Sequence, residues 1–153
     1  MFNWYRKKAV DYFSPAEKEK IVTAIRKAEQ RTSGEIRVYI ESKCRFVNAL
    51  DRAIELFDGL NMYTTKERNA VLVYIAMKDR QLAIYADQGI YQKMGSGFWN
   101  DQVKVMMHHF NKNDYADGIA TIVDSIGKAL YQNFPYDAKT DTNELSDDIV
   151  FGN

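Results

Sequence analysis

The chain has 153 residues and a mass of 17.7 kDa, which is the size of one typical domain. Apolar residues make up 46% and charged residues 27%, so the composition is that of a folded globular chain and excludes disorder of the whole. The 21 basic side chains balance 21 acidic ones, which disfavours nucleic acid as a partner.

A single cysteine, Cys44, excludes an intramolecular disulfide and every zinc motif with several cysteines. No apolar run reaches the roughly 18 residues that a membrane span needs. The basic residues Arg6, Lys7 and Lys8 are not followed by the apolar segment of a secretory signal. We therefore expect a cytoplasmic monomer without a membrane span.

The first predicted elements are a helix, a strand and a second helix. Ser14, Pro15 and Glu17 predict a helix start with a capping box, and the helix is expected to stop at Ser33-Gly34. Alternating apolar residues predict a strand over 35–42. A helix of about three turns follows, with an apolar face at helical spacing made of Leu50, Ala53, Ile54, Phe57 and Leu60.

The next segment predicts a hairpin. The continuous apolar run 70–76 is typical of a strand buried on both faces, a polar turn covers 77–80, and a third strand covers 81–87. Glycines at 89, 95 and 97 indicate a loop with at most one helical turn over 88–98. Two more helices are expected, from Phe98 to about Phe110 and from Asp114 to the stop at Phe134-Pro135.

We predict one domain over residues 1–135, with its core over 14–135, followed by a tail over 136–153. The tail has five acidic residues against one lysine, which is typical of a solvated segment. Its end, Ile149 to Phe151, could instead attach to the domain or to another chain. The order of elements predicts an α/β sandwich, with helices on both faces of a small mixed sheet.

Strand geometry brings acidic residues together. If the first two strands are parallel, Glu35 and the residues before Ala70 lie at the same end of the sheet, and the hairpin places Asp87 opposite Ala70. Glu67 and Asn69 should then lie near Asp87, and Glu35 joins them if its strand is adjacent. Such oxygen ligands suit Ca²⁺ or Mg²⁺, so these four residues are our predicted metal site. The alternative is that the carboxylates are exposed and paired with Arg68, Lys66 or Arg37.

Several segments together resemble the TPM domain family. They run, in order, from Ser33 to Val38, from Glu67 to Tyr74 and from Ile84 to Ile90, followed by Phe98-Trp99, 115–119 and Phe134-Pro135. The resemblance covers about residues 14–135 and implies an αβα sandwich around about four strands. Only three strands are evident from the sequence, so the fourth is expected near 43–46 or in the tail.

The resemblance also implies possible functions. Some family members are linked to divalent metals, some to phosphatase activity and others to partner binding. Asp87 and Gly89 match the family's loop motif after the third strand, and Glu67 and Asn69 match the acidic or amide position before the second. Ala70 and Ala86 stand where many relatives have glycine.

We therefore expect a Ca²⁺- or Mg²⁺-binding regulatory or partner-interaction domain in which the metal orders two crossing loops. The alternatives are a metal-dependent phosphatase acting on phosphate monoesters and a structural module that needs no metal. The sequence names no protein partner and contains no nucleophile elbow, phosphate loop or dinucleotide motif.

Overall fold

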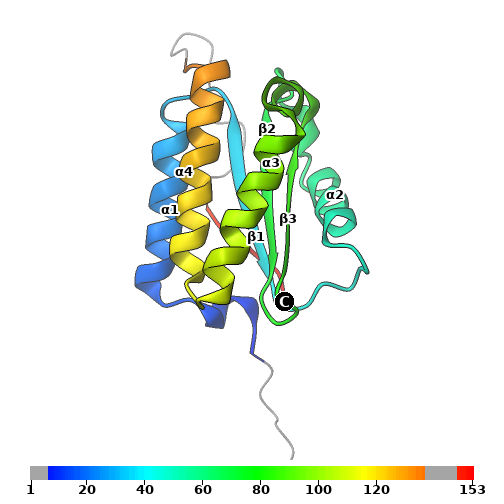
Figure 1. The fold of residues 1–153 in the computed structure, drawn as a ribbon, viewed down its shortest axis with the longest axis vertical. Coiled ribbons are helices and arrows are strands. Elements are labelled where there is room, and N and C mark those ends of the chain that lie inside the picture. Colours follow the sequence, from blue (N-terminus) through cyan, green and yellow to red (C-terminus); the bar gives the residue numbers. More distant parts are fainter. Residues whose placement is uncertain (1–6, 137–147) are drawn as a thin grey trace, which may run out of the picture.

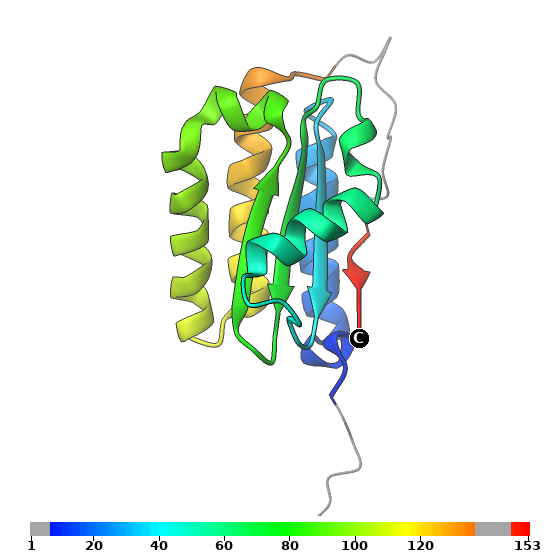
Figure 2. The same ribbon diagram turned by 90° about the vertical axis from the view of Figure 1, so that its right-hand side faces the viewer.

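A computed structural model describes residues 7–136 and 148–153 and shows one sheet covered by helices on both faces (Figure 1). Three helices cover one face: α1 (Pro15–Glu29), α3 (Gln88–Asn111) and α4 (Tyr115–Asn133). Helix α2 (Ala49–Gly59) crosses the other face (Figure 2). The predicted αβα sandwich is confirmed.

The sheet is mixed and has the order β3-β2-β1-β4. Strand β1 (Glu35–Glu41) runs parallel to β2 (Ala70–Ala76), and β3 (Gln81–Ala86) returns antiparallel to β2. Ala76 pairs with Gln81, so the hairpin has the predicted turn over 77–80. The Asp87 N–H donates to the Ala70 carbonyl over 2.9 Å, which places Asp87 at the start of β2 as the register predicts.

The fourth strand lies at the end of the chain. Strand β4 (Val150–Phe151) pairs in parallel with β1, next to Tyr39 and Ile40. Ile149 is buried, and the Phe151 ring lies 6.3 Å from the ring of Phe13. The last part of the predicted tail thus belongs to the sheet, while 137–147 lie outside the described residues.

Helix α1 starts as predicted and ends earlier than predicted. The Ser14 hydroxyl accepts from the Glu17 N–H over 3.1 Å, and the Glu17 carboxylate accepts from the Ser14 N–H over 2.9 Å. After Glu29 the chain leaves the helix, and Thr32 bridges to Pro135 at the end of α4. This pairing uses backbone groups that a longer helix would need for itself.

The prediction of a loop over 88–98 is wrong. Helix α3 already begins at Gln88. Asp87 is its N-cap, and the Asp87 carboxylate accepts from the Gln88 N–H over 2.7 Å. Only Gly95 departs from helical backbone angles, at φ 79°, and it kinks the helix there. Glycine spacing alone does not distinguish a kinked helix from a loop.

Two short 3₁₀ helices, η1 (Ala9–Tyr12) and η2 (Met62–Thr64), complete the described structure. The larger core lies between the sheet and α1, α3 and α4, and a smaller one lies under α2. Helix α2 buries Ala53 and Phe57, whereas Leu50 and Ile54, predicted to face inward, are each 41% exposed. Within the described residues, no helix combines the length and the apolar character that crossing a membrane would require.

Candidate functional site

Two loops cross where β2 begins and β3 ends. We call residues 65–69 and 87–89 the loop crossing. The Gly89 N–H donates to the Arg68 carbonyl over 2.8 Å. A Cβ atom on Gly89 would lie 2.2 Å from the Glu67 carbonyl oxygen and 2.5 Å from that of Arg68. Only glycine permits this approach, so the two loops pack backbone against backbone.

Asp87 is the buried acid of the loop crossing. Its side chain is 4% exposed, and one of its carboxylate oxygens lies 2.7 Å from Nε of Arg68. The hydrogen bond to Asp87 raises the pKa of the Arg68 guanidinium above its ordinary value. Arg68 is itself 42% exposed and has a left-handed backbone, with φ 52°. Asp87 is therefore neutralised by an arginine that reaches in from the solvent side.

Asn69 and Glu35 connect β1 to β2. Asn69 is buried, and its side-chain amide donates to the Ser33 hydroxyl over 3.3 Å. Its backbone carbonyl accepts from the Glu35 N–H over 3.4 Å. Glu35 is also buried, and it lies on β1, two strands away from β3. Because adjacent strands lie about 4.8 Å apart, its backbone is roughly 10 Å from that of Asp87.

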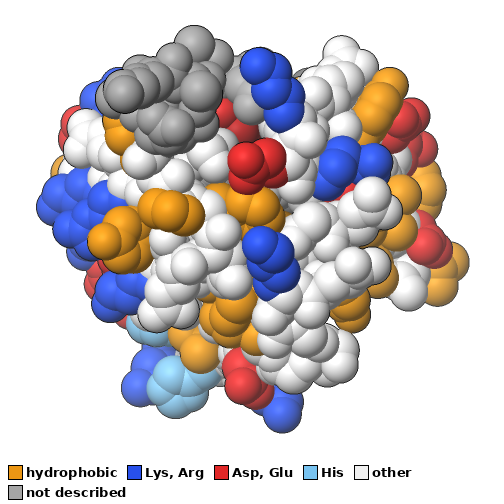
Figure 3. All heavy atoms as spheres, turned by 90° about the horizontal axis from the view of Figure 1, so that it is seen from above, with side chains coloured by type: hydrophobic (Ala, Val, Ile, Leu, Met, Phe, Trp, Pro, Cys, Tyr) orange, Lys and Arg blue, Asp and Glu red, His pale blue; other side chains and the backbone are white. Residues whose placement is uncertain are grey.

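Glu67 is exposed, on the outer side of the loop crossing. The structure thus brings Glu67, Asn69 and Asp87 to one end of the sheet but directs their side chains differently. Across residues 7–136 and 148–153, no three or more His, Cys, Asp or Glu side chains form a group able to hold a metal ion. In the surface seen from this end, acidic and basic side chains are interspersed (Figure 3).

The oxygen atoms at the loop crossing are still of the kind that hard cations prefer. They are the Asp87 carboxylate, the carbonyls of Glu67 and Arg68 next to Gly89, and the exposed Glu67 carboxylate. The alternative to a metal site predicted exposed carboxylates paired with Arg68, Lys66 or Arg37; Asp87 does pair with Arg68, but it is buried. Chemically, the buried Asp87 carboxylate can be neutralised by the Arg68 side chain, as it is here, or by a bound cation in its place.

A pocket at the other end of the sheet was not predicted from the sequence. It is lined by residues from five separate segments between Lys7 and Asn153. Several of these segments contain lysine or arginine without any local motif. The available signal is the set of basic residues at 7, 8, 43, 45, 52 and 78, and scattered cations of this kind are ordinary for a solvated surface.

The layers and the loop crossing define a small α/β sandwich domain with a clamped pair of loops. The sequence model of the TPM domain matches residues 7–129, and the chain belongs to this family. A search of the curated proteins gave no match.

Two solved structures are similar to the chain. One is the BA42 protein from the psychrophilic bacterium Bizionia argentinensis, with 35% identity, a TM-score of 0.82, and coverage of 90% of this chain and 94% of that one. The other is the N-terminal domain of cg2496 from Corynebacterium glutamicum, with 16% identity, a TM-score of 0.60, and coverage of 77% and 74%. The second likeness shows the fold alone.

Proposed function

We propose that this TPM domain is a regulatory or partner-interaction module whose loop crossing exchanges the Arg68 guanidinium for a divalent cation, Ca²⁺ or Mg²⁺. The observation that carries the proposal is the Asp87–Arg68 pair. A carboxylate that is 4% exposed needs a positive charge beside it, and the charge it has comes from a side chain that is 42% exposed. Because the Arg68 guanidinium is already partly hydrated, it can move to solvent when another cation takes its place beside Asp87.

The donors at the loop crossing fit a hard cation. Asp87 would supply a buried carboxylate, and Glu67 would add its carboxylate from the adjacent loop. Asn69 and Glu35 remain predicted ligands. Asn69 bonds to the segment before β1 and Glu35 is the first residue of β1, so both can support the loop before β2. A bound dication could be ligated by carboxylates of both loops at once, whereas Arg68 belongs to one loop and pairs with a carboxylate of the other.

Exchange would alter what a partner meets at this surface. Release of Arg68 frees a guanidinium that is now held by Asp87, and it frees the left-handed turn at residue 68 from that ion pair. The close backbone contact at Gly89 connects this turn to the start of α3. A partner that binds here would therefore distinguish the two states by charge and by loop conformation.

Titration calorimetry of metal-free protein with Ca²⁺ and with Mg²⁺ tests the proposal. We expect saturable heat from the unaltered chain and none from Asp87→Asn. Arg68→Gln should bind metal about two- to fivefold more tightly, because the competing cation is gone. The matched control is Lys66→Gln, which loses the same charge from an exposed neighbour and should change the affinity less than Arg68→Gln.

Other outcomes select the alternatives. If neither the unaltered chain nor Arg68→Gln gives heat at millimolar metal, the Asp87–Arg68 pair is a permanent clamp in a metal-independent module. Metal-dependent hydrolysis of a simple phosphate monoester, lost in Asp87→Asn, would favour the phosphatase alternative. No contact at the loop crossing by itself favours hydrolysis over binding.

A further inference from the structure

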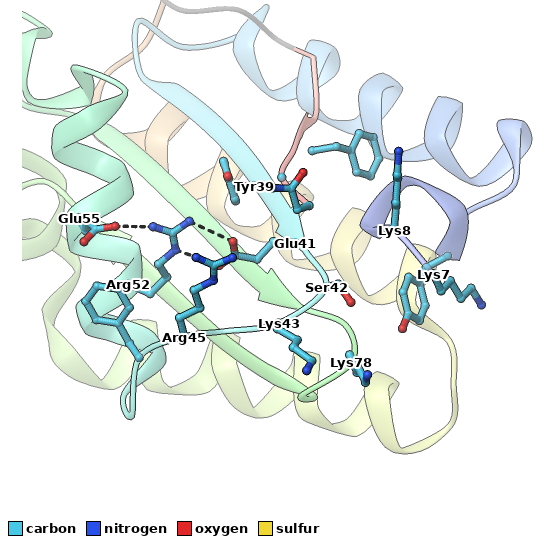
Figure 4. Close-up of a pocket in the computed structure, with 15 residues that line it drawn as sticks. Lys7, Lys8, Tyr39, Glu41, Ser42, Lys43, Arg45, Arg52, Glu55 and Lys78 are labelled. Atoms are coloured by element: carbon cyan, nitrogen blue, oxygen red, sulfur yellow. Dashed lines mark hydrogen bonds and ion pairs between the residues drawn. The ribbon is translucent and has the colours of Figure 1, made fainter. Parts of the chain in front are cut away.

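A pocket of about 1240 Å³ lies where β1 and β4 end, at the opposite end of the sheet from the loop crossing (Figure 4). The segment before η1, the end of β1 with the loop after it, α2, the β2–β3 turn and the end of β4 all line it. Six of the lining side chains are basic: Lys7, Lys8, Lys43, Arg45, Arg52 and Lys78. Among the described residues that line the pocket, Glu41 and Glu55 are the only acidic ones, so these lining residues have an excess of four positive side-chain charges.

Arg52 already neutralises both acids. Its Nε and Nη2 atoms lie 2.9 and 3.0 Å from the two carboxylate oxygens of Glu41, and Nη1 contacts Glu55. The hydrogen bond to Glu41 is the main cause of the raised pKa of Arg52. Glu41 also accepts a hydrogen bond from the Tyr74 hydroxyl. Arg52, Glu41 and Glu55 form one wall of the pocket, and both described acids of the lining are thereby paired with Arg52.

The other five cations that line the pocket have no acidic partner among the described side chains. Within residues 7–136 and 148–153, none of Lys7, Lys8, Lys43, Arg45 and Lys78 forms an ion pair. The chain as a whole has no net charge. The local excess is consequently a property of this one concave surface and not of a generally basic protein.

The backbone holds the two sides of this basic surface together. The Lys78 N–H donates to the Ser42 carbonyl over 2.7 Å, and the Cys44 N–H donates to the Asp79 carboxylate over 2.8 Å. These bonds tie the β2–β3 turn to the segment after β1. Hydrogen bonds thus fix the backbone that carries Lys43, Arg45 and Lys78. This backbone lies at the carboxyl ends of parallel strands, where open α/β sheets commonly bind ligands.

We propose that this pocket binds a small anion that bears phosphate groups, recognised chiefly by Lys43, Arg45 and Lys78. A phosphate group has a charge of about −2 and three strong acceptor oxygens, which suits several converging lysine and arginine donors. Four aromatic side chains, Tyr12, Tyr39, Phe46 and Phe151, also line the pocket and can contact a ring attached to the phosphates. This site is independent of the metal proposed above.

Calorimetry in low-salt buffer free of divalent metal, with sodium pyrophosphate and with ATP, tests the proposal. We expect saturable binding of both, with at least tenfold weaker binding to a triple variant, Lys43→Ala, Arg45→Ala and Lys78→Ala. The matched control is Lys27→Ala, Lys104→Ala and Lys112→Ala, which removes the same charge from exposed residues outside the pocket and should change affinity by less than twofold.

The two ligands and two further probes separate the possible sources of binding. ATP that binds more tightly than pyrophosphate, with no binding of adenosine alone, would assign the site to nucleotides; equal affinities would assign it to the phosphates only. Either result supports the proposal. It is overturned if no saturable binding occurs, if the control triple weakens binding as much, or if citrate binds equally well. Asp87→Asn should leave phosphate binding unchanged, which separates this result from the outcome at the loop crossing.

Discussion

Asp87 and Glu41 are buried carboxylates at opposite ends of the sheet, and each meets an arginine. Glu41 receives two bonds from Arg52, which is 20% exposed, and a third from the buried Tyr74 hydroxyl. Asp87 has one arginine bond, from a guanidinium twice as exposed. The same residue types therefore form a network of several bonds at one end and a single, more solvent-exposed pair at the other, and solvent competes more strongly for Arg68.

The Tyr74 hydroxyl predicts a specific loss of stability in alkali. Burial, together with the hydrogen bond to Glu41, raises the pKa of Tyr74 well above 10.0, its ordinary value. An unfolded chain ionises this tyrosine above pH 10 while the folded chain keeps the proton. The free energy of unfolding should therefore fall with rising pH in this range, by about 1.4 kcal/mol per pH unit from this group.

Tyr74→Phe should remove that contribution. Denaturant unfolding at several values between pH 9 and pH 11 would show a shallower decline for the variant than for the unaltered chain. Tyr131→Phe, at an exposed position, is the control and should keep the steeper decline. Parallel curves for all three proteins would mean that Tyr74 ionises as readily in the folded state as in the unfolded one.

At the scale of single elements, helix α3 depends on its first turn. Asp87 caps it, and Gly89 in that turn touches the backbone of the loop before β2. The helix continues to Gly95, turns there at φ 79°, and resumes to Asn111. The three glycines of this region thus have different roles, because only the surroundings of each decide whether a side chain fits.

Two glycine-to-alanine variants of α3 should differ in sign. Gly89→Ala places a Cβ 2.2 Å from a backbone carbonyl oxygen, so we expect a loss of about 2 kcal/mol or more in the free energy of unfolding. Gly97→Ala meets nothing within 4 Å, so alanine's better helix propensity should add up to about 1 kcal/mol. Urea denaturation measures both. Equal effects would show that the loop before β2 yields to the new methyl group.

At the scale of the whole molecule, the end of the chain completes the sheet. Strand β4 covers the edge of β1, and the Gly152 N–H donates to the Ile40 carbonyl over 2.8 Å. Residues 148–153 thereby protect the open edge of a central strand and supply part of the basic pocket. The tail predicted from the sequence to be a solvated segment thus contains a strand of the sheet at 150–151.

Removal of residues 148–153 should destabilise the domain and promote self-association. Loss of the buried Ile149 side chain alone removes about 2 kcal/mol of apolar burial, and the uncovered β1 edge can pair with a second chain. Thermal unfolding and light scattering would measure the two effects. Ile149→Ala, which keeps the edge paired, is the control and should lower stability without association. A shortened chain that stays monomeric and equally stable would contradict this role.

The sequence alone specified those elements that depend on interactions between residues close together in the chain. Ser14 and Glu17 specify a helix start through bonds three residues apart, and the apolar run 70–76 specifies a buried strand. The turn over 77–80 then determines the hairpin register by counting, which correctly placed Asp87 beside Ala70. These features could be read directly because each depends on neighbours in the chain.

Which side chains of distant segments contact one another was decided only by tertiary packing. That Asn69 faces Ser33, that Asp87 faces Arg68 and that Gly89 touches a carbonyl depends on which side chains occupy the space between two loops. The pocket likewise brings together cations from four separate segments, and β4 pairs with the edge of β1, which is distant in the chain. Sequence spacing specifies the end of the sheet at which a residue lies, whereas the direction of its side chain is settled by contacts with residues distant in the chain.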